Sequence, residues 1–144
     1  MWRLKHPPRP KRSSAQVGEM NGIERRFQAE VVDPLLGNGT VQRAYYETFN
    51  LRLAPRTDYR PDFALLFTDG LFVFVETKAG WVKDGEIKAH YTDDARVKIK
   101  VAAEIFPEFG FVGAMHHKNL RGGWSYECFT IDPIEWSQRL GLKV

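Results

Sequence analysis

Two acidic residues and one lysine in this sequence have the types and spacing needed for metal-assisted phosphate chemistry. Asp62 opens one apolar run, whereas Glu76 and Lys78 close the next. Hard divalent cations such as magnesium take oxygen ligands and keep several waters, so two carboxylates and a substrate phosphate are enough for a site. A metal held there polarises the phosphate and lowers the pKa of a bound water. A lysine beside it can orient that water or offset charge growing on the phosphate, and Lys78 would take this role.

A β-hairpin is the element that would bring these residues together. The two apolar runs are joined by residues 68–70, whose Asp-Gly dipeptide is typical of a tight turn. A hairpin places the start of its first strand beside the end of its second, so Asp62 should lie near Glu76. Glu76 and Lys78 are two residues apart, so on a strand both side chains point to the same face. Because both runs are apolar on both faces, we expect this hairpin to be covered on both sides.

A helix is predicted before the hairpin. Apolar residues recur at the four-residue spacing of one helical face, at Ile23, Phe27, Val31 and Leu35. Asn21 precedes them as a plausible N-cap. We expect the helix to end at about Val32 or at the Asp33-Pro34 dipeptide, because the residue before a proline disfavours helical geometry.

Weaker patterns predict the remaining elements. Val41–Leu53 is rich in strand-forming residues and predicts one strand or two. Helical spacing favours a second helix over an alternating strand, with its apolar face at Ala95, Ile99, Ala102 and Phe106. We also expect strands over Phe109–Met115 and Trp124–Ile131, and a short helix that begins at Asp132-Pro133.

The distribution of charge separates a tail from a body. The chain of 144 residues has the size of one domain, which we place over residues 19–144. Residues 1–18 combine prolines with basic residues and predict a flexible tail, which either adds phosphate contacts or is dispensable. The net charge is +3, but the tail supplies Arg3, Lys5, Arg9, Lys11 and Arg12 before the first acid. The body is therefore net negative, and charge alone does not make it a nucleic-acid binder.

Cysteine usage and hydropathy limit the environment of the protein. Cys128 is the only cysteine, which excludes an intramolecular disulfide and a cysteine-based zinc site. No apolar run approaches the roughly 20 residues that a membrane span needs. We expect a cytoplasmic protein.

The acidic residues and the lysine also carry a family resemblance. Pro61-Asp62 followed by Glu76-Thr77-Lys78 resembles the signature of the PD-(D/E)XK nuclease superfamily. Glu24 on the first helix is similar to a glutamate that completes the metal site in some members. The second helix, with Arg96, Lys98 and Lys100, follows the Glu-x-Lys strand as it does in that superfamily. Residues 20–115 further resemble small endonuclease-like proteins of phages and prophages, although the commoner Glu-x-Lys-Gly ending is Ala79-Gly80 here.

This resemblance implies a fold, a reaction and partners. The fold would be an α/β restriction-endonuclease-like αβββαβ core with a mixed central sheet flanked by helices, extended by a C-terminal strand and a short helix. Asp62, Glu76 and Glu24 would bind Mg²⁺, for which Mn²⁺ substitutes, and Lys78 would position the attacking water. The substrate would be DNA, with branched or junction DNA as one candidate. We expect a homodimer, since two symmetric cuts need two sites, encoded by a phage or prophage in a bacterial host.

Several residues keep two interpretations at this stage. Glu24 competes with Glu30 as the helical ligand. Arg96 and Lys100 are four apart and could bind successive phosphates, or they and Lys98 form a solvated face. Arg25 on the first helix is a further candidate for DNA contact. Other ambiguous residues are His116 and His117, which suit a loop or DNA contact better than a metal, and Trp81 and Trp124, which either stack on bases or pack in the core.

The function also keeps two alternatives. The chain could be a non-catalytic DNA-binding or assembly subunit of a phage or transposition complex, although the intact Asp, Glu and Lys argue against it. It could instead be an end-cutting nuclease that works only beside a transposase-like partner.

Overall fold

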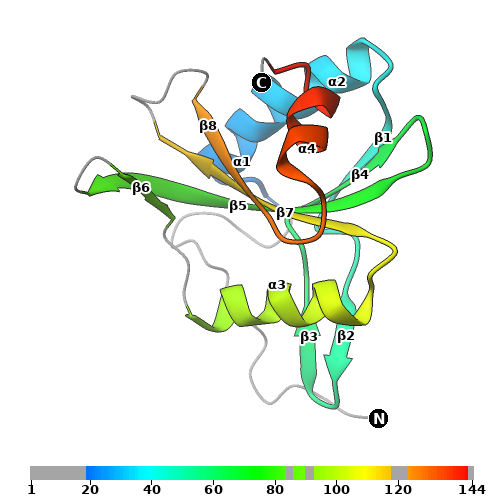
Figure 1. The fold of residues 1–144 in the computed structure, drawn as a ribbon, viewed down its shortest axis with the longest axis vertical. Helices are drawn as coiled ribbons and strands as arrows, with labels where there is room; N and C mark the ends of the chain where they lie inside the picture. Colours follow the sequence, from blue (N-terminus) through cyan, green and yellow to red (C-terminus); the bar gives the residue numbers. More distant parts are fainter. Residues whose placement is uncertain (1–18, 84–85, 90–92, 118–122, 143–144) are drawn as a thin grey trace.

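A mixed β-sheet forms the centre of the protein and is covered on both faces (Figure 1). The computed structural model describes residues 19–83, 86–89, 93–117 and 123–142. In chain order the elements are α1 (Gly22–Phe27), the π-helical turn η1 (Gln28–Val32), α2 (Asp33–Gly37), β1 (Val41–Tyr46), β2 (Leu51–Ala54), β3 (Thr57–Tyr59), β4 (Phe63–Phe67), β5 (Phe72–Lys83), β6 (Glu86–Ala89), α3 (Asp93–Ile105), β7 (Gly110–His116), β8 (Trp124–Cys128) and α4 (Pro133–Arg139). The expected α/β class with a mixed sheet is confirmed.

The order of strands follows from the connections between them. The main sheet runs β1-β4-β5-β7-β8, and β6 pairs with the far end of β5. Among the strand pairs of the described residues, only β5 and β7 are parallel. The chain between them includes β6 and α3, since parallel neighbours need a crossover. The other pairs are antiparallel, and β2 and β3 form a separate two-stranded hairpin.

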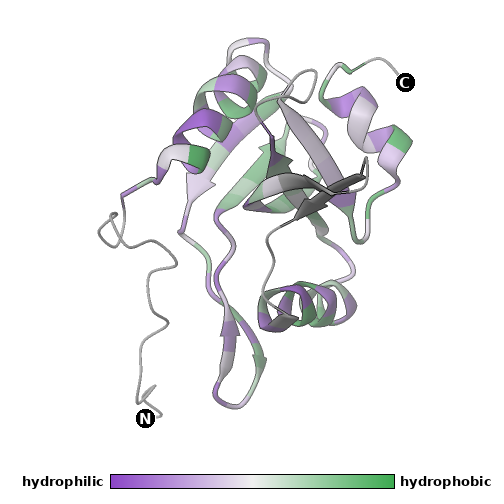
Figure 2. Ribbon diagram, turned by 90° about the vertical axis from the view of Figure 1, so that its left-hand side faces the viewer, coloured by the Kyte–Doolittle hydropathy of each residue, from purple (hydrophilic) through white to green (hydrophobic). Residues whose placement is uncertain are grey.

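Two apolar layers enclose the sheet because side chains alternate along each strand. One layer lies under α1, η1, α2 and α4 and includes Phe63, Leu65 and Phe67 of β4. The other lies under α3 and the β2–β3 hairpin and includes Ala64 of β4 and Phe74 of β5. In Figure 2 the central strands are mostly green, whereas the helices carry both green and purple segments. The prediction that the β4–β5 hairpin is covered on both sides is confirmed.

The predicted end of the first helix is wrong. The helix continues through Asp33-Pro34 to Gly37, because one π-helical turn intervenes. The Asp33 N–H donates to the carbonyl of Gln28, five residues back. Pro34 then stands in the first turn of α2, where its missing N–H is not needed.

The hairpin that carries the candidate site is confirmed. Strands β4 and β5 pair from Phe63↔Val75 to Leu66↔Phe72, and Gly70 in the turn has a φ of 98°. Beyond the pairing with β4, β5 continues to Lys83 and pairs with β6, which the sequence did not predict. The segment 41–53 contains two strands, of which β2 pairs with the unpredicted β3.

The remaining predicted elements are present with small shifts in their ends. Helix α3 and strand β7 lie where expected, and β8 ends at Cys128 instead of Ile131. Asp132 caps α4, because its side chain accepts from the backbone N–H groups of Ile134 and Glu135. The predicted tail, residues 1–18, lies outside the described residues. No helix in the described part of the chain is long and apolar enough to cross a membrane.

The single cysteine gives a first prediction. Burial, with the charges of Asp132 and Glu127, raises the pKa of the Cys128 thiol from 9.0 to about 11. Because only the thiolate reacts, we expect iodoacetamide at pH 8 to alkylate the native protein about 100-fold more slowly than the unfolded chain. Mass spectrometry of timed samples with and without denaturant measures both rates. Equal rates would contradict this environment of Cys128.

Candidate active site

Asp62 is fixed at the point where the β4–β5 hairpin ends. It lies just before β4 with only 5% of its surface exposed. Its Oδ2 accepts hydrogen bonds from the backbone N–H of Thr77, at 2.9 Å, and from the Thr77 hydroxyl, at 3.0 Å. The carboxylate is therefore held against β5, next to Glu76.

Glu76 and Lys78 form a partly buried ion pair on β5. The Lys78 Nζ lies 3.1 Å from Oε1 of Glu76, and the side chains are 11% and 1% exposed. The hydroxyl of Tyr59 donates to the other oxygen, Oε2, at 2.8 Å. The expectation that Glu76 and Lys78 share a face agrees with this contact. Side chains alternate between the two faces along β5, and Phe74 lies on the face covered by α3. Glu76 and Lys78, two and four residues later, therefore lie on that same face.

Glu24 comes to the same region from the opposite face of the sheet, at the start of α1. It forms a capping box with Asn21: the Glu24 N–H donates to Asn21 Oδ1, and the Asn21 N–H donates to Glu24 Oε1. The Tyr46 hydroxyl also donates to Glu24 Oε1, at 2.7 Å. Glu24 is fully buried, whereas Glu30, its rival in the sequence, is exposed. The positive end of the helix dipole favours a carboxylate at this position.

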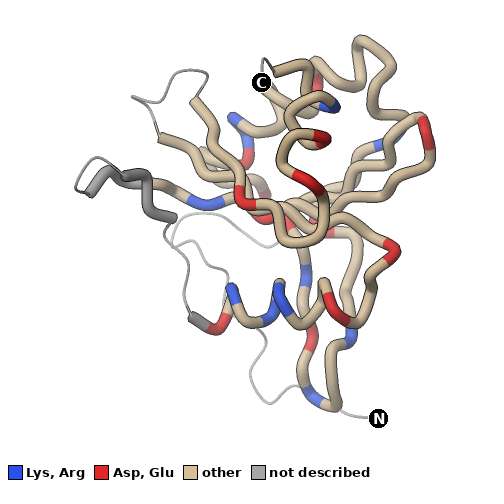
Figure 3. Tube along the Cα trace, in the orientation of Figure 1, with Lys and Arg blue, Asp and Glu red and all other residues tan. Residues whose placement is uncertain are grey.

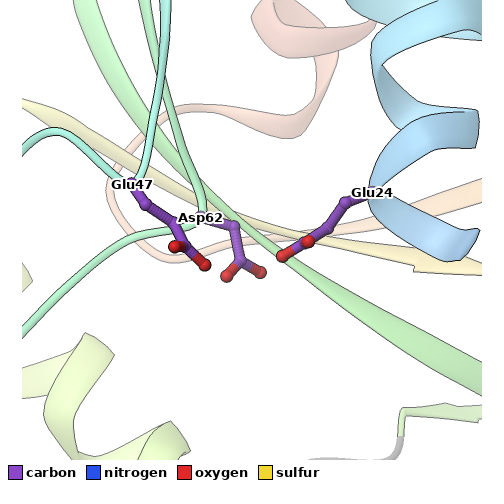
Figure 4. Close-up of side chains that lie close together, drawn as sticks. All are labelled: Glu24, Glu47 and Asp62. Atoms are coloured by element: carbon purple, nitrogen blue, oxygen red, sulfur yellow. The ribbon is translucent and has the colours of Figure 1, made fainter. Parts of the chain in front are cut away.

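Glu47 completes the acidic cluster, and sequence reasoning missed it. One carboxylate oxygen from each of Glu24, Glu47 and Asp62 lies within 4.8 Å of the other two (Figure 4). Glu47 follows β1 with a φ of 48°, a left-handed conformation that costs a non-glycine residue roughly 1–3 kcal/mol. Its N–H donates to the carbonyl of Asp62 at 2.9 Å, which holds the two residues side by side.

The donor set of this cluster fits a hard divalent cation. Magnesium binds oxygen ligands at about 2.0–2.1 Å, so two of its ligand oxygens are at most about 4.2 Å apart. Oxygens within 4.8 Å reach that geometry with small side-chain movements. A cation would also relieve the repulsion among neighbouring carboxylates. The expected ligand set of Glu24, Asp62 and Glu76 thus differs from the cluster in one member, since Glu76 lies against Tyr59 and Lys78.

The residues proposed for DNA contact occupy two regions. Helix α3 carries Arg96, Lys98 and Lys100 on the side of the sheet that Glu76 and Lys78 face (Figure 3). Arg96 pairs with Glu127 on β8, and Lys98 Nζ lies 3.5 Å from Asp94 Oδ2. Lys100 is exposed. Arg25 is exposed on α1, so it stands apart from the other three.

The ambiguous aromatic and histidine residues are explained in part by packing. The His116 ring packs edge-on against Trp124, and Trp124 Nε1 donates to Glu30 at 3.3 Å. Trp124 is 9% exposed, which favours its core interpretation. Burial, with the charge of Arg26, lowers the pKa of His116, which keeps the ring neutral near pH 7. His117 is half-buried, and the side chain of Trp81 lies outside the described part of the chain.

Comparisons with known proteins found no relative of this chain. No model of a protein family, no curated protein and no solved structure matches the chain significantly. The resemblance to PD-(D/E)XK nucleases therefore rests on the residues of the site and on the elements that position them.

Proposed function

We propose that this protein is a metal-dependent endonuclease that hydrolyses DNA phosphodiester bonds. The observation that carries the proposal is the cluster of Glu24, Glu47 and Asp62 at the end of the hairpin where Glu76 pairs with the partly buried Lys78. Asp62, Glu76 and Glu24 are 5%, 1% and 0% exposed, although buried acids are rare unless they are paired or bind a cation. A purely structural role would not need so many acids in one place.

The order of elements supports a restriction-endonuclease-like core. Helix α1, strands β1, β4 and β5, helix α3 and strand β7 occur in the order helix, three strands, helix and strand, and β6 adds a hairpin between β5 and α3. The β2–β3 hairpin is an insertion between the first two of these strands, and β8 and α4 extend the core. In this arrangement, Asp62 precedes the second core strand, while Glu76 and Lys78 lie on the third.

The proposed roles follow from what each side chain contacts. Glu24, Glu47 and Asp62 would hold Mg²⁺, or Mn²⁺ in its place. Glu76 follows Val75, the partner of Phe63 in the β4–β5 pairing, so it stands across from Asp62. The bound cation would polarise the scissile phosphate and lower the pKa of a coordinated water. Lys78 supplies a positive charge next to Glu76, where it can orient the attacking water or offset charge on the phosphate. Lys100, with Arg96, Lys98 and Arg25, would contact DNA phosphates.

A panel of DNA substrates tests this function. The protein is incubated with Mg²⁺ and linear duplex, nicked, single-stranded or four-way-junction DNA, and the products are sized. We expect cleavage of at least one substrate by the wild type, and strong losses in Glu76→Ala and Lys78→Ala. Salt-sensitive DNA binding without any cleavage would favour a non-catalytic subunit instead. Cleavage that appears only when a transposase-like partner is added would identify the end-cutting alternative, and sedimentation would test the proposed homodimer.

Cation binding by Glu47 is a separate prediction. Replacing Glu47 by Gln removes one anionic ligand from the cluster, so we expect the affinity for Mn²⁺ to fall about tenfold or more. Isothermal titration calorimetry with Mn²⁺ measures this without any DNA. The matched control is Glu104→Gln, since Glu104 is an exposed acid on α3. If Glu47→Gln and Glu104→Gln bind Mn²⁺ like the wild type, Glu47 is not a ligand.

A further inference from the structure

The β2–β3 hairpin contributes a buried tyrosine to the candidate site. Tyr59 lies at the end of β3, is 5% exposed, and donates its hydroxyl to Glu76 Oε2 at 2.8 Å. The hairpin does not join the main sheet. The hairpin reaches the acidic residues through the phenol group of Tyr59.

The packing around Tyr59 fixes where its hydroxyl lies. The Tyr59 ring belongs to the apolar layer that contains Ile99 and Ala102 of α3 and Phe74 of β5. In the hairpin, Tyr59 on β3 pairs with Leu51 on β2. The next pair along the hairpin, Arg52 and Asp58, is joined by an ion pair in which Arg52 Nε lies 2.5 Å from Asp58 Oδ1. A ring held between a helix and a sheet loses little further freedom when its hydroxyl bonds to a carboxylate.

Tyr59 and Lys78 divide the two oxygens of Glu76 between them. Lys78 Nζ is 3.1 Å from Oε1, while the Tyr59 hydroxyl donates to Oε2. A carboxylate that accepts from a fixed donor on one oxygen cannot rotate freely about its last torsion. The other oxygen, Oε1, is thereby kept toward Lys78, the residue with the proposed role at the phosphate. Hydrogen bonds to a charged group are also stronger than bonds between neutral groups.

We propose that Tyr59 is a positioning residue, which holds Glu76 so that its Oε1 and Lys78 stay in the arrangement that the reaction requires. This inference rests on the proposed nuclease function. It also assigns a role to the inserted β2–β3 hairpin, which is to deliver a neutral hydrogen-bond donor to the site from outside the main sheet. A neutral donor leaves the charge balance between Glu76 and Lys78 unchanged.

Tyr59→Phe removes only the hydroxyl, and Tyr45→Phe is its matched control. Tyr45 packs at the edge of the same apolar layer, against the rings of Phe49 and Phe72, at 5.3 and 6.4 Å. We expect Tyr59→Phe to lower kcat for DNA cleavage about tenfold or more with KM for DNA within twofold of the wild type. Tyr45→Phe should leave both constants within twofold. Since the substitution keeps the ring, thermal unfolding checks that both variants remain folded at the assay temperature.

The outcomes separate this inference from the proposed function. If the wild type cleaves DNA and Tyr59→Phe matches it, the positioning role is wrong while the nuclease assignment stands. If the wild type cleaves nothing, the proposed function fails, and NMR of protein labelled at tyrosine Cζ tests the contact directly. We expect the Tyr59 signal to shift in Glu76→Gln while the Tyr45 signal stays in place. An unshifted Tyr59 signal would overturn the inference without reference to activity.

Discussion

Replacing Asp62 by Asn is expected to reduce Mg²⁺-dependent DNA cleavage by roughly 10³-fold or more. Asp62 belongs to the acidic cluster with Glu24 and Glu47, and its other neighbour, Thr77, donates two hydrogen bonds to Oδ2. Asn has nearly the same shape and keeps an oxygen that can accept these bonds, but it lacks the negative charge. The substitution should therefore lower the cleavage rate and the affinity for the cation, while the fold stays intact. Single-turnover cleavage with enzyme in excess measures the effect.

The thermal stability of Asp62→Asn checks that its loss of activity does not come from unfolding. Neighbouring carboxylates repel one another when no cation is bound, so Asp62→Asn should unfold at the same or a higher temperature in the presence of a chelator. Asp69→Asn is the matched control, because Asp69 lies at the opposite end of the hairpin and pairs with Arg139. We expect Asp69→Asn to cleave DNA within twofold of the wild type. Cleavage by Asp62→Asn at the wild-type rate would remove Asp62 from the site.

Phe27→Ala should produce the largest loss of stability among simple core substitutions near the site, about 3–5 kcal/mol. Phe27 has no exposed surface, and its ring lies 5.0 Å from Phe63 on β4 and 5.1 Å from Trp124 on β8. It is therefore a main anchor of the helix that carries Glu24. Urea unfolding followed by tryptophan fluorescence measures the change. Since native domains are stable by only about 5–15 kcal/mol, the variant should lose a large share of its free energy of unfolding.

The matched substitution Phe27→Leu tests whether packing is the cause. Leucine refills most of the volume, so we expect a much smaller loss, of about 1–2 kcal/mol. At temperatures where Phe27→Ala is still folded, its cleavage should also fall, because α1 no longer holds Glu24 firmly. If Phe27→Ala is as stable as the wild type, Phe27 does not anchor α1 to the sheet.

The elements that sequence analysis predicted well are those with local signals. The β4–β5 hairpin follows from two apolar runs and an Asp-Gly turn, and α3 follows from the spacing of its buried face. These signals also account for the position of Asp62 across the hairpin from Glu76. The burial of Glu24 was predictable from its place beside the apolar face of the first helix.

The features that were missed depend on contacts between distant segments. Glu47 stands opposite Asp62 only because β1 pairs with β4 in the register Tyr46↔Phe63. If the pairing of β1 with β4 had been known, this register would have identified Glu47 as a candidate ligand. In the sequence alone, Glu47 is an acidic residue after a predicted strand, with no further signal. The π-helical turn η1 was missed for another reason, since the proline rule predicts a helix end and carries no information about a wider turn. The ion pair of Arg96 with Glu127 likewise depends on the fold, which brings α3 within reach of a residue 31 positions later on β8.

The most direct test of the proposed function is the conversion of a covalently closed plasmid that carries an extruded cruciform, because it offers both duplex and junction DNA in one substrate. With Mg²⁺, the wild type should convert the closed circle into nicked or linear DNA, and EDTA should stop the conversion. Lys78→Met, which keeps much of the side-chain volume without the charge beside Glu76, should leave the plasmid closed. A plasmid that stays closed with the wild type in both Mg²⁺ and Mn²⁺, or one that Lys78→Met cuts equally fast, would contradict the assignment of this site.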